Sequence, residues 1–199
     1  MFAFPYIEGT APGFTVAQVA KPYEELAMHI LFVCTGNVCR SPTAERLAIA
    51  YATRSRLADL RASSAGTQAL TGHPMERHAA LVVEKLGGDT SSFVARQLTP
   101  AIAGDVDLVL TMTMAHRDDV LRLVPHQLSR TFTLAEAARL ISEGDARTVA
   151  DLAALRPQFP AQSSSDIADP MGRDDSFFAS VGARIAELVP VILRLRQGD

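Results

Sequence analysis

An apolar run that leads straight into a short polar loop and a helix start constrains this chain more than any other feature. The run is residues 30–33, and its bulky apolar side chains are typical of a strand buried on both faces of a parallel sheet. Ser41 and Pro42 have the residue types of a helix N-cap and a first helical turn, so we expect Ser41 to cap a helix there. The residues between, 34–40, must form a tight loop.

Such a loop turns several backbone N–H groups inward and adds the positive end of the helix dipole, a combination that binds a dianion. Cys34 stands at its mouth, where the dipole and the Arg40 guanidinium favour a thiolate, so we predict that Cys34 is a nucleophile. The planar fork of Arg40 suits two phosphate oxygens, and Ser41 is placed to donate its hydroxyl to the thiolate. Gly36 and Asn37 best tolerate left-handed backbone in such a loop. The residues predicted to bind phosphate are Thr35, Gly36, Asn37, Val38, Cys39 and Ser41.

Strand and helix patterns alternate along the rest of the chain. Thr113 and Thr133 are expected helix N-caps, and Glu136 completes a capping box with Thr133. The alternation predicts an α/β fold of flavodoxin- or Rossmann-like type, a three-layer sandwich in which helices cover both faces of a four-stranded parallel sheet. The loop that holds Cys34 then lies at the carboxyl edge of the sheet, where such folds bind ligands. We predict further strands at residues 60–66, 107–112 and 130–133, and helices at residues 44–57, 75–86, 115–124, 134–141 and 177–195.

Length and composition describe one folded domain preceded by an extension. The chain has 199 residues, of which 48% are hydrophobic and 21% charged, enough to bury a full core. Residues 1–28 contain scattered Pro and Gly and no clear apolar period, so we assign them to an N-terminal extension and residues 29–199 to the domain.

The charge and hydropathy patterns exclude several kinds of partner. A formal net charge of -3 gives no basic surface for nucleic acid, and no apolar run is long enough to span a membrane. The N-terminus lacks the charged region, apolar core and cleavage site of a secretory signal. We therefore expect a cytoplasmic protein that binds neither nucleic acid nor a membrane.

Two polar stretches have ordinary structural interpretations. Residues 116–119, His-Arg-Asp-Asp, fall on the polar side of the expected helix and lack further ligands at metal-binding spacing, so we expect a solvated face and no metal site. Residues 143–167 include Pro157, Pro160 and a Gln-Ser-Ser-Ser run, which predicts a long mobile loop with a helical turn near residues 149–155.

The loop sequence Cys-Thr-Gly-Asn-Val-Cys-Arg-Ser-Pro at residues 34–42, with a strand before it and a helix after it, resembles the low-molecular-weight protein tyrosine phosphatases. The resemblance covers about residues 30–196 and implies the strand order 2-1-3-4. It also implies a cysteine-dependent phosphomonoester hydrolase that forms a cysteinyl-phosphate and needs no cofactor. The family places an Asp-Pro over the pocket with Asp as general acid and base, and here that residue is Asp169. The implied substrate is a phosphotyrosine protein or a small aryl phosphate.

The resemblance assigns two further residues around the loop. Ser64 stands where a family Ser braces the phosphate loop through its Asn, so Ser64 would support Asn37; from the residues alone it is equally a small side chain packed beside the loop. Relatives with a second loop cysteine form a reversible disulfide with the nucleophile, which makes Cys39 a candidate redox partner or else a small apolar loop residue. A His often stands where this chain has Phe93, so that part of the bracing differs here.

Two other functions use the same loop. Arsenate reductases share the fold and the cysteine loop and usually recruit distant cysteines, but the two cysteines of this chain both lie in the loop. A reductase would then need a small external thiol. The other alternative is a catalytically silent phosphate-binding module, against which the joint presence of Cys34, Arg40 and Asp169 argues. Met171 and Gly172 follow the Asp-Pro where relatives that favour phosphotyrosine often carry aromatic residues, yet phosphotyrosine remains the preferred prediction.

Overall fold

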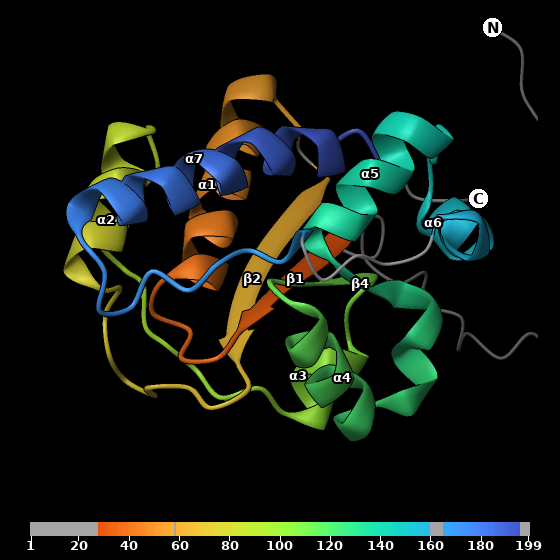
Figure 1. Ribbon diagram of the computed structural model, residues 1–199, viewed down its shortest axis with the longest axis horizontal. Coiled ribbons are helices and arrows are strands. Elements are labelled where there is room, and N and C mark those ends of the chain that lie inside the picture. The colour runs from red at the N-terminus through yellow and green to blue at the C-terminus, as the bar shows by residue number, and fades with distance from the viewer. Residues whose placement is uncertain (1–27, 58, 160–164, 196–199) are drawn as a thin grey trace, which may run out of the picture.

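The sheet at the centre of the molecule has the predicted topology. The computed structural model describes residues 28–57, 59–159 and 165–195 (Figure 1). Its four strands are parallel and lie in the order β2-β1-β3-β4, which confirms the sheet and the strand order. Residues 1–27 of the predicted extension lie outside the described residues. The strands are β1 Met28–Cys34, β2 Leu60–Gly66, β3 Leu108–Thr111 and β4 Thr131–Thr133.

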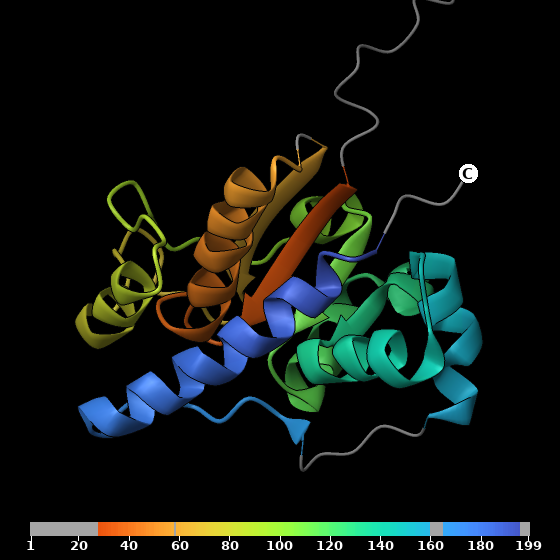
Figure 2. The ribbon, with the colours of Figure 1, turned by 90° about the horizontal axis from the view of Figure 1, so that it is seen from above.

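Helices cover both faces of this sheet, as predicted (Figures 1 and 2). Helices α1, α5 and α7 pack on one face, and α3 and α4 pack on the other. Short α3 and the 3-10 turn η2 were not predicted, because neither is long enough to show a helical period. No helix in the described ranges combines the length and apolar character needed to cross a membrane. The helices are α1 Arg40–Ser55, α2 Arg77–Lys85, α3 Pro100–Gly104, α4 Met114–Leu123, α5 Leu134–Gly144, α6 Val149–Leu155 and α7 Asp175–Ile192, with 3-10 turns η2 Pro125–Arg130 and η3 Arg156–Gln158.

Strand β1 is the centre of the core. Ile30 and Phe32 point into the cluster under α1, α5 and α7, whereas Leu31 and Val33 point into the cluster under α3 and α4. All four side chains are fully buried. Because β1 is covered on both faces, its sequence is continuously apolar rather than alternating, and the end of β1 that holds Cys34 is fixed by packing on two sides.

One of the predicted helix caps is wrong, and the reason bears on the site. Thr113 Oγ1 accepts the N–H of His116, and Thr133 with Glu136 forms a complete capping box, as predicted. Helix α1, however, begins at Arg40 with Cys39 as its N-cap, and no side chain caps it. Ser41 lies within the first turn, and its hydroxyl contacts a partner outside the helix. The N–H groups of that turn are therefore left for a ligand.

The segment predicted as a long loop over residues 143–167 contains the helical turn expected near residues 149–155, but it holds more helix than predicted. Helix α5 extends to Gly144, and α6 and η3 together occupy residues 149–158; residues 160–164 lie outside the described residues. Beyond them the chain is anchored again, since the Ile167 N–H donates to the Met112 carbonyl at 2.8 Å and Asp166 Oδ1 accepts the Met114 N–H at 3.0 Å. These two bonds bring the following Asp169 to the edge of the sheet.

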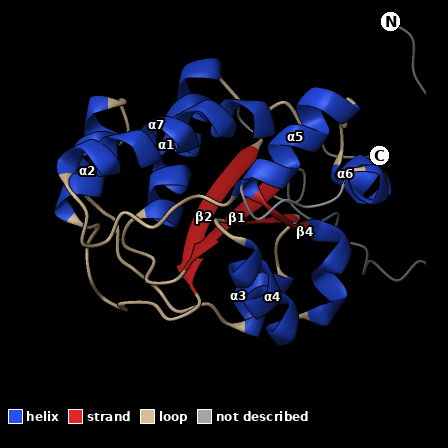
Figure 3. Cartoon of the chain, viewed as in Figure 1, coloured by secondary structure: helices blue, strands red, loops and turns tan. Residues whose placement is uncertain are grey.

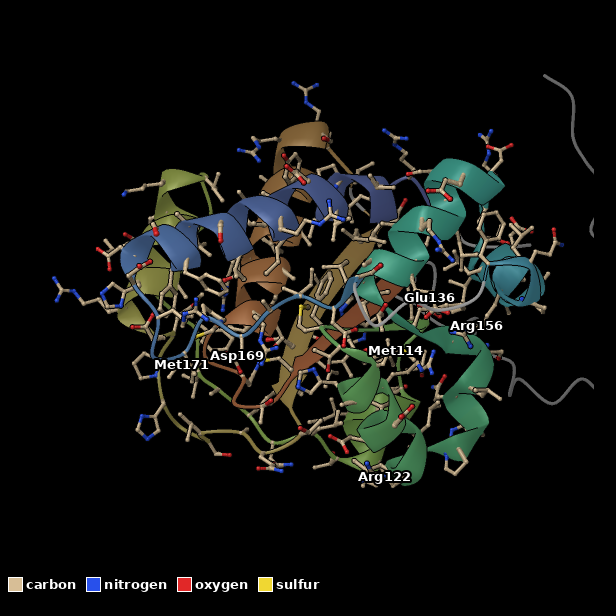
Figure 4. The ribbon with its side chains drawn as sticks, viewed as in Figure 1. Met114, Arg122, Glu136, Arg156, Asp169 and Met171 are labelled. Atoms are coloured by element: carbon tan, nitrogen blue, oxygen red, sulfur yellow. The ribbon has the colours of Figure 1, made fainter. Side chains whose placement is uncertain are left out.

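A buried ion pair ties α6 and η3 to this frame, and we expect Glu136→Ala to break it at a large cost. The Glu136 side chain is 3% exposed, and its Oε1 accepts Arg156 Nε at 3.0 Å (Figure 4). The Arg156 guanidinium also stacks 3.7 Å from the centre of the Phe132 ring. Removing the carboxylate leaves the Arg156 cation, whose side chain is 22% exposed, without this anionic partner, so the free energy of unfolding, measured in urea, should fall by at most about 3 to 5 kcal/mol, the cost of breaking a fully buried pair.

The matched control is Glu187→Ala, which breaks an ion pair with Arg184 whose two side chains are 66% and 53% exposed. Exposed pairs contribute about 0.2 to 1 kcal/mol. If the two alanine variants destabilise the protein equally, the Glu136 cluster is not an important support.

Candidate active site

The loop between β1 and α1 lies at the carboxyl edge of the sheet, where loops gather beyond the strand ends (Figure 3). Its carbonyl groups point outward, because the segment 67–76 donates N–H groups to the carbonyls of Cys34, Thr35, Gly36 and Val38 at 2.8–3.0 Å. In the described part of the chain, the N–H groups of residues 35–41 have no protein acceptor. The loop is therefore a cradle of free N–H donors, as an anion site requires.

Of the two loop residues that best tolerate left-handed backbone, one adopts it. Asn37 has φ 53°, whereas Gly36 has no positive φ. The sharp turn is therefore made by Asn37, whose short polar side chain tolerates that conformation and is itself held on several sides.

The Cys34 sulfur lies at the bottom of the cradle. It is 2% exposed, and its Sγ lies 3.0 Å from Ser41 Oγ. Asn37 Nδ2 donates to the same Ser41 Oγ at 3.0 Å, so the Ser41 hydroxyl proton faces two acceptors, the Cys34 sulfur and the Ala65 carbonyl at 3.5 Å, of which the carbonyl is at the limit of hydrogen-bond distance. The Ser41 hydroxyl thus contacts the Cys34 sulfur, and this contact explains why it does not cap the helix.

Asn37 is the centre of a buried polar network behind the loop. Its Nδ2 donates to Ser64 Oγ at 2.8 Å, and its Oδ1 accepts the Arg96 N–H at 2.8 Å. Ser64 Oγ in turn donates to Glu45 Oε2 at 2.5 Å. The contact expected between Ser64 and Asn37 is present, and it continues to a carboxylate on α1 that the sequence did not reveal. Burial raises the pKa of Glu45, which means that the charged form of this side chain destabilises the folded protein relative to the neutral form.

The destabilising effect of the Glu45 charge can be measured by comparing the stability of Glu45→Gln and wild type as a function of pH. Because the folded state raises the pKa of Glu45 above its ordinary value of 4.5, the folded protein binds that proton more tightly than the unfolded chain does. The contribution of Glu45 to stability therefore falls as the pH rises above 4.5. We expect the free energy of unfolding of the variant, relative to wild type, to increase from acidic to neutral pH in urea titrations. Exposed Glu187→Gln is the control, and a difference that shrinks with rising pH would contradict the expectation.

Arg40 and Asp169 face each other across the cradle. Arg40 is 5% exposed, and its Nη2 donates to Asp169 Oδ2 at 2.5 Å while its Nη1 donates to the Ile167 carbonyl at 3.1 Å. The Asp169 side chain is 48% exposed and lies on the connection that leads into α7 (Figure 4). The structure thus brings together the three residues predicted to be catalytic, with the carboxylate bound to the guanidinium.

His116 does not belong to a solvated helix face, so that prediction is wrong. The first turn of α4 packs against the loop, and the His116 ring, 6% exposed, lies 2.8 Å from Thr35 Oγ1. Burial, with the Arg40 charge as a smaller cause, lowers the pKa of His116 to about 4. Asp118 on the same helix is exposed, as predicted. His116 stands three positions after the N-cap Thr113, so it lies on the same side of the helix as the cap. This spacing is the sequence signal that could have placed His116 near the loop.

Cys39 differs from Cys34 in its surroundings. It is 4% exposed, and its Sγ lies 3.3 Å from the sulfur of Met171. Burial, with the nearby Glu76 charge, raises the pKa of Cys39 to about 12, so it is a protonated thiol at neutral pH. Both cysteines are free, and a redox role for Cys39 stays a prediction.

Glu45 and Arg96 had weaker signals in the sequence. Glu45 interrupts the small apolar residues of the inward face of α1. Arg96 donates its backbone N–H to Asn37 Oδ1 at 2.8 Å and its Nε to the Ser64 carbonyl at 2.7 Å, and no sequence pattern reveals either bond. Phe93, where relatives often have His, packs in an apolar cluster with Val38 and Cys39. Glu45 and Arg96 therefore hold the network without a histidine at that position.

Comparisons with known proteins agree on one family. The family model described as low molecular weight phosphotyrosine protein phosphatase matches residues 29–195. A probable low molecular weight protein-tyrosine-phosphatase, AmsI of Erwinia amylovora, is 38% identical over 102 residues, 51% of this chain and 67% of the relative. A protein-arginine-phosphatase of Geobacillus stearothermophilus is 32% identical over 143 residues, 72% of this chain and 78% of the relative.

Solved structures give the same result. The crystal structure of the Erwinia amylovora tyrosine phosphatase AmsI has a TM-score of 0.64 and 28% identity, covering 84% of this chain and 91% of that chain. The YwlE arginine phosphatase from Geobacillus stearothermophilus has a TM-score of 0.64 and 28% identity, covering 83% and 90%. Because the family model spans the whole described domain and these relatives share its fold, this chain belongs to the low molecular weight phosphotyrosine protein phosphatase family.

Proposed function

We propose that this protein hydrolyses phosphotyrosine in proteins through a cysteinyl-phosphate intermediate. The observation that carries the proposal is the arrangement around one cradle of free N–H groups: Cys34 at its start, Arg40 at its end and Asp169 opposite. A nucleophile, an anion clamp and an acid at these positions are what phosphoryl transfer requires.

In the first step, Cys34 Sγ attacks phosphorus in line with the departing oxygen. The S–P bond forms as the P–O bond breaks, and Asp169 gives its proton to the leaving phenolate. Arg40 and the loop N–H groups hold the remaining phosphoryl oxygens as negative charge spreads over them. Arg40 must exchange Asp169 for the phosphoryl group in this step, which frees the carboxyl group to face the leaving oxygen.

In the second step, water replaces the sulfur. Asp169, now ionised, takes a proton from the water as its oxygen attacks phosphorus, and the S–P bond breaks to return the Cys34 thiolate. Ser41 donates to that thiolate and stabilises it as a leaving group. The products are inorganic phosphate and the dephosphorylated side chain.

Two exposed apolar side chains beside the cradle favour an aromatic substrate. Leu70 is 48% exposed and its N–H donates to the Gly36 carbonyl, so its side chain stands beside the loop. Met171 is 51% exposed and contacts Cys39. A phenyl ring above the phosphate gains apolar contact from both side chains.

Phosphoarginine is a second candidate substrate. The match to the arginine phosphatase covers 72% of this chain, whereas the match to AmsI covers 51%. The chemistry is the same, except that a P–N bond breaks and Asp169 protonates nitrogen.

The test is hydrolysis of matched peptides that carry phosphotyrosine or phosphoarginine, alongside para-nitrophenyl phosphate. We expect chelator-resistant turnover with a higher kcat/KM on phosphotyrosine. A higher kcat/KM on phosphoarginine would reject the first candidate in favour of the second. No turnover, together with arsenate-dependent consumption of a small thiol, would reject both and identify an arsenate reductase. Tight phosphate binding with neither activity would identify a silent binding module.

A further inference from the structure

His116 joins the phosphate cradle to the start of α4 through two threonine hydroxyls. Its Nε2 lies 2.8 Å from Thr35 Oγ1, and its Nδ1 lies 2.9 Å from Thr113 Oγ1. The backbone N–H of His116 also donates to Thr113 Oγ1, at 3.2 Å. Since His116 is 6% exposed, its two ring nitrogens depend on these threonines for their hydrogen bonds.

One placement of the protons on His116 and its two threonines leaves the Thr35 hydroxyl free to donate. The pKa of His116, lowered by burial to about 4, makes the ring neutral at neutral pH, so it carries one N–H. Thr113 Oγ1 already accepts a backbone N–H, and an arrangement in which it donates its own proton to Nδ1 uses both its donor and its acceptor capacity. The ring proton is then on Nε2 and is donated to Thr35 Oγ1. The hydroxyl proton of Thr35 is left for another acceptor.

Thr35 is placed to use that proton on a ligand. It follows Cys34 directly, and Thr35 and Gly36 are the two residues of the stretch 34–41 that are not buried. An anion that enters the cradle therefore meets Thr35 at a partly exposed position. An oriented hydroxyl adds a donor that costs no reorganisation when the phosphoryl group arrives.

We propose that His116 is a positioning residue for the phosphatase reaction: it accepts the Thr113 proton, donates Nε2–H to Thr35, and so directs the Thr35 hydroxyl to a phosphoryl oxygen in the cradle. The inference rests on the proposed function and adds a side-chain donor to the backbone groups and Arg40.

The charged groups that face His116 come from three elements. Arg40 on α1 opposes protonation of the ring, whereas Asp119 on α4 and Asp169 on the connection before α7 favour it. Burial and Arg40 prevail, so the ring is neutral at both mildly acidic and neutral pH. The effect of the Thr35 hydroxyl should then be the same across mildly acidic and neutral pH.

The first test replaces the hydroxyl. Thr35→Val removes it and keeps the shape of the side chain, and Thr35→Ser restores it. A hydrogen bond to a charged group corresponds to about a 10- to 100-fold effect, so we expect Thr35→Val to lower kcat/KM and to weaken binding of inorganic phosphate within that range. Thr35→Ser should recover most of both losses. Wild-type kinetics and phosphate binding in Thr35→Val would overturn the inference.

The second test asks whether His116 acts through Thr35. His116→Leu should lower kcat/KM in the wild-type background and change it less than about twofold in the Thr35→Val background, because the two residues form one unit. His116→Gln, which keeps an N–H donor near the position of Nε2, is the conservative partner and should retain more activity. Equal losses from His116→Leu in both backgrounds would reject the link, and thermal melting identifies any variant that is not folded.

A third measurement needs no turnover. In the ¹⁵N NMR spectrum of the full chain at neutral pH, with and without inorganic phosphate, we expect the His116 proton on Nε2 and none on Nδ1. A proton on Nδ1 would overturn the inference while leaving the proposed function intact. Loss of phosphate-ester turnover in wild type, with the expected tautomer present, would instead reject the proposed function.

Discussion

Cys34→Ser is expected to lower phosphatase turnover by at least about 10⁴-fold, the scale of effect seen when a nucleophile is removed. Ser keeps the size of the side chain but offers a protonated hydroxyl in place of a thiolate. The N–H cradle and Arg40 are unchanged, so the variant should still bind inorganic phosphate. Steady-state kinetics and a phosphate titration on the same protein separate the two effects.

Cys39→Ser is the matched comparison for this result. It makes the same change in the same loop, at a thiol whose pKa of about 12 keeps it protonated. We expect its loss of turnover to be smaller than that of Cys34→Ser by at least about 10²-fold. Similar losses in the two variants would mean that the loop is merely disturbed, and acid-quenched wild type with phosphate on Cys39 would reassign the nucleophile.

Asp169→Asn is expected to give the second largest effect, and one that depends on the leaving group. Loss of a general acid costs about 10² to 10⁴-fold when the departing oxygen needs a proton, as in phenyl phosphate or phosphotyrosine. 2,4-Dinitrophenyl phosphate needs little protonation, so its first step should be slowed far less. The measurement is single-turnover release of each phenol, and equal losses for both esters would reject the acid role.

The same variant has an opposite effect on binding. In wild type the Asp169 carboxylate lies 2.5 Å from Arg40 Nη2, so we expect it to compete with phosphate for the guanidinium. Removing its charge should strengthen binding of inorganic phosphate even as turnover falls. Weaker phosphate binding in Asp169→Asn would show that the carboxylate does not compete for Arg40.

The sequence predicts those parts of the site that are continuous along the chain. Strand β1, the loop and the start of α1 are one stretch, so the residue order alone places Cys34 and Arg40 at opposite ends of an anion cradle. The strand order and Asp169 came from the family resemblance, since neither follows from local pattern. The misplaced cap at Ser41 shows the limit of local rules: a residue with capping chemistry gave its hydroxyl to a tertiary partner, Cys34, instead.

The supporting residues were not predictable in the same way. Glu45, Arg96 and His116 reach the loop from α1, from the segment before α3 and from α4, and their partners lie 19 to 81 positions away in sequence. Helical periodicity assigns a polar residue to the outside unless a buried partner is known. His116 was therefore placed on the surface, and Glu45 was not recognised, although both are buried by contacts that only the folded chain creates.

The ion pair between Arg40 and Asp169 affects which anions can bind in the cradle. An anion that reaches the guanidinium must replace a carboxylate that is already in place and carries one negative charge. A phosphate monoester carries two charges near neutral pH, whereas a phosphodiester or chloride carries one and gains little by the exchange. We therefore expect the cradle to bind doubly charged esters in preference to singly charged anions, because only the doubly charged group gains from replacing the Asp169 carboxylate on Arg40.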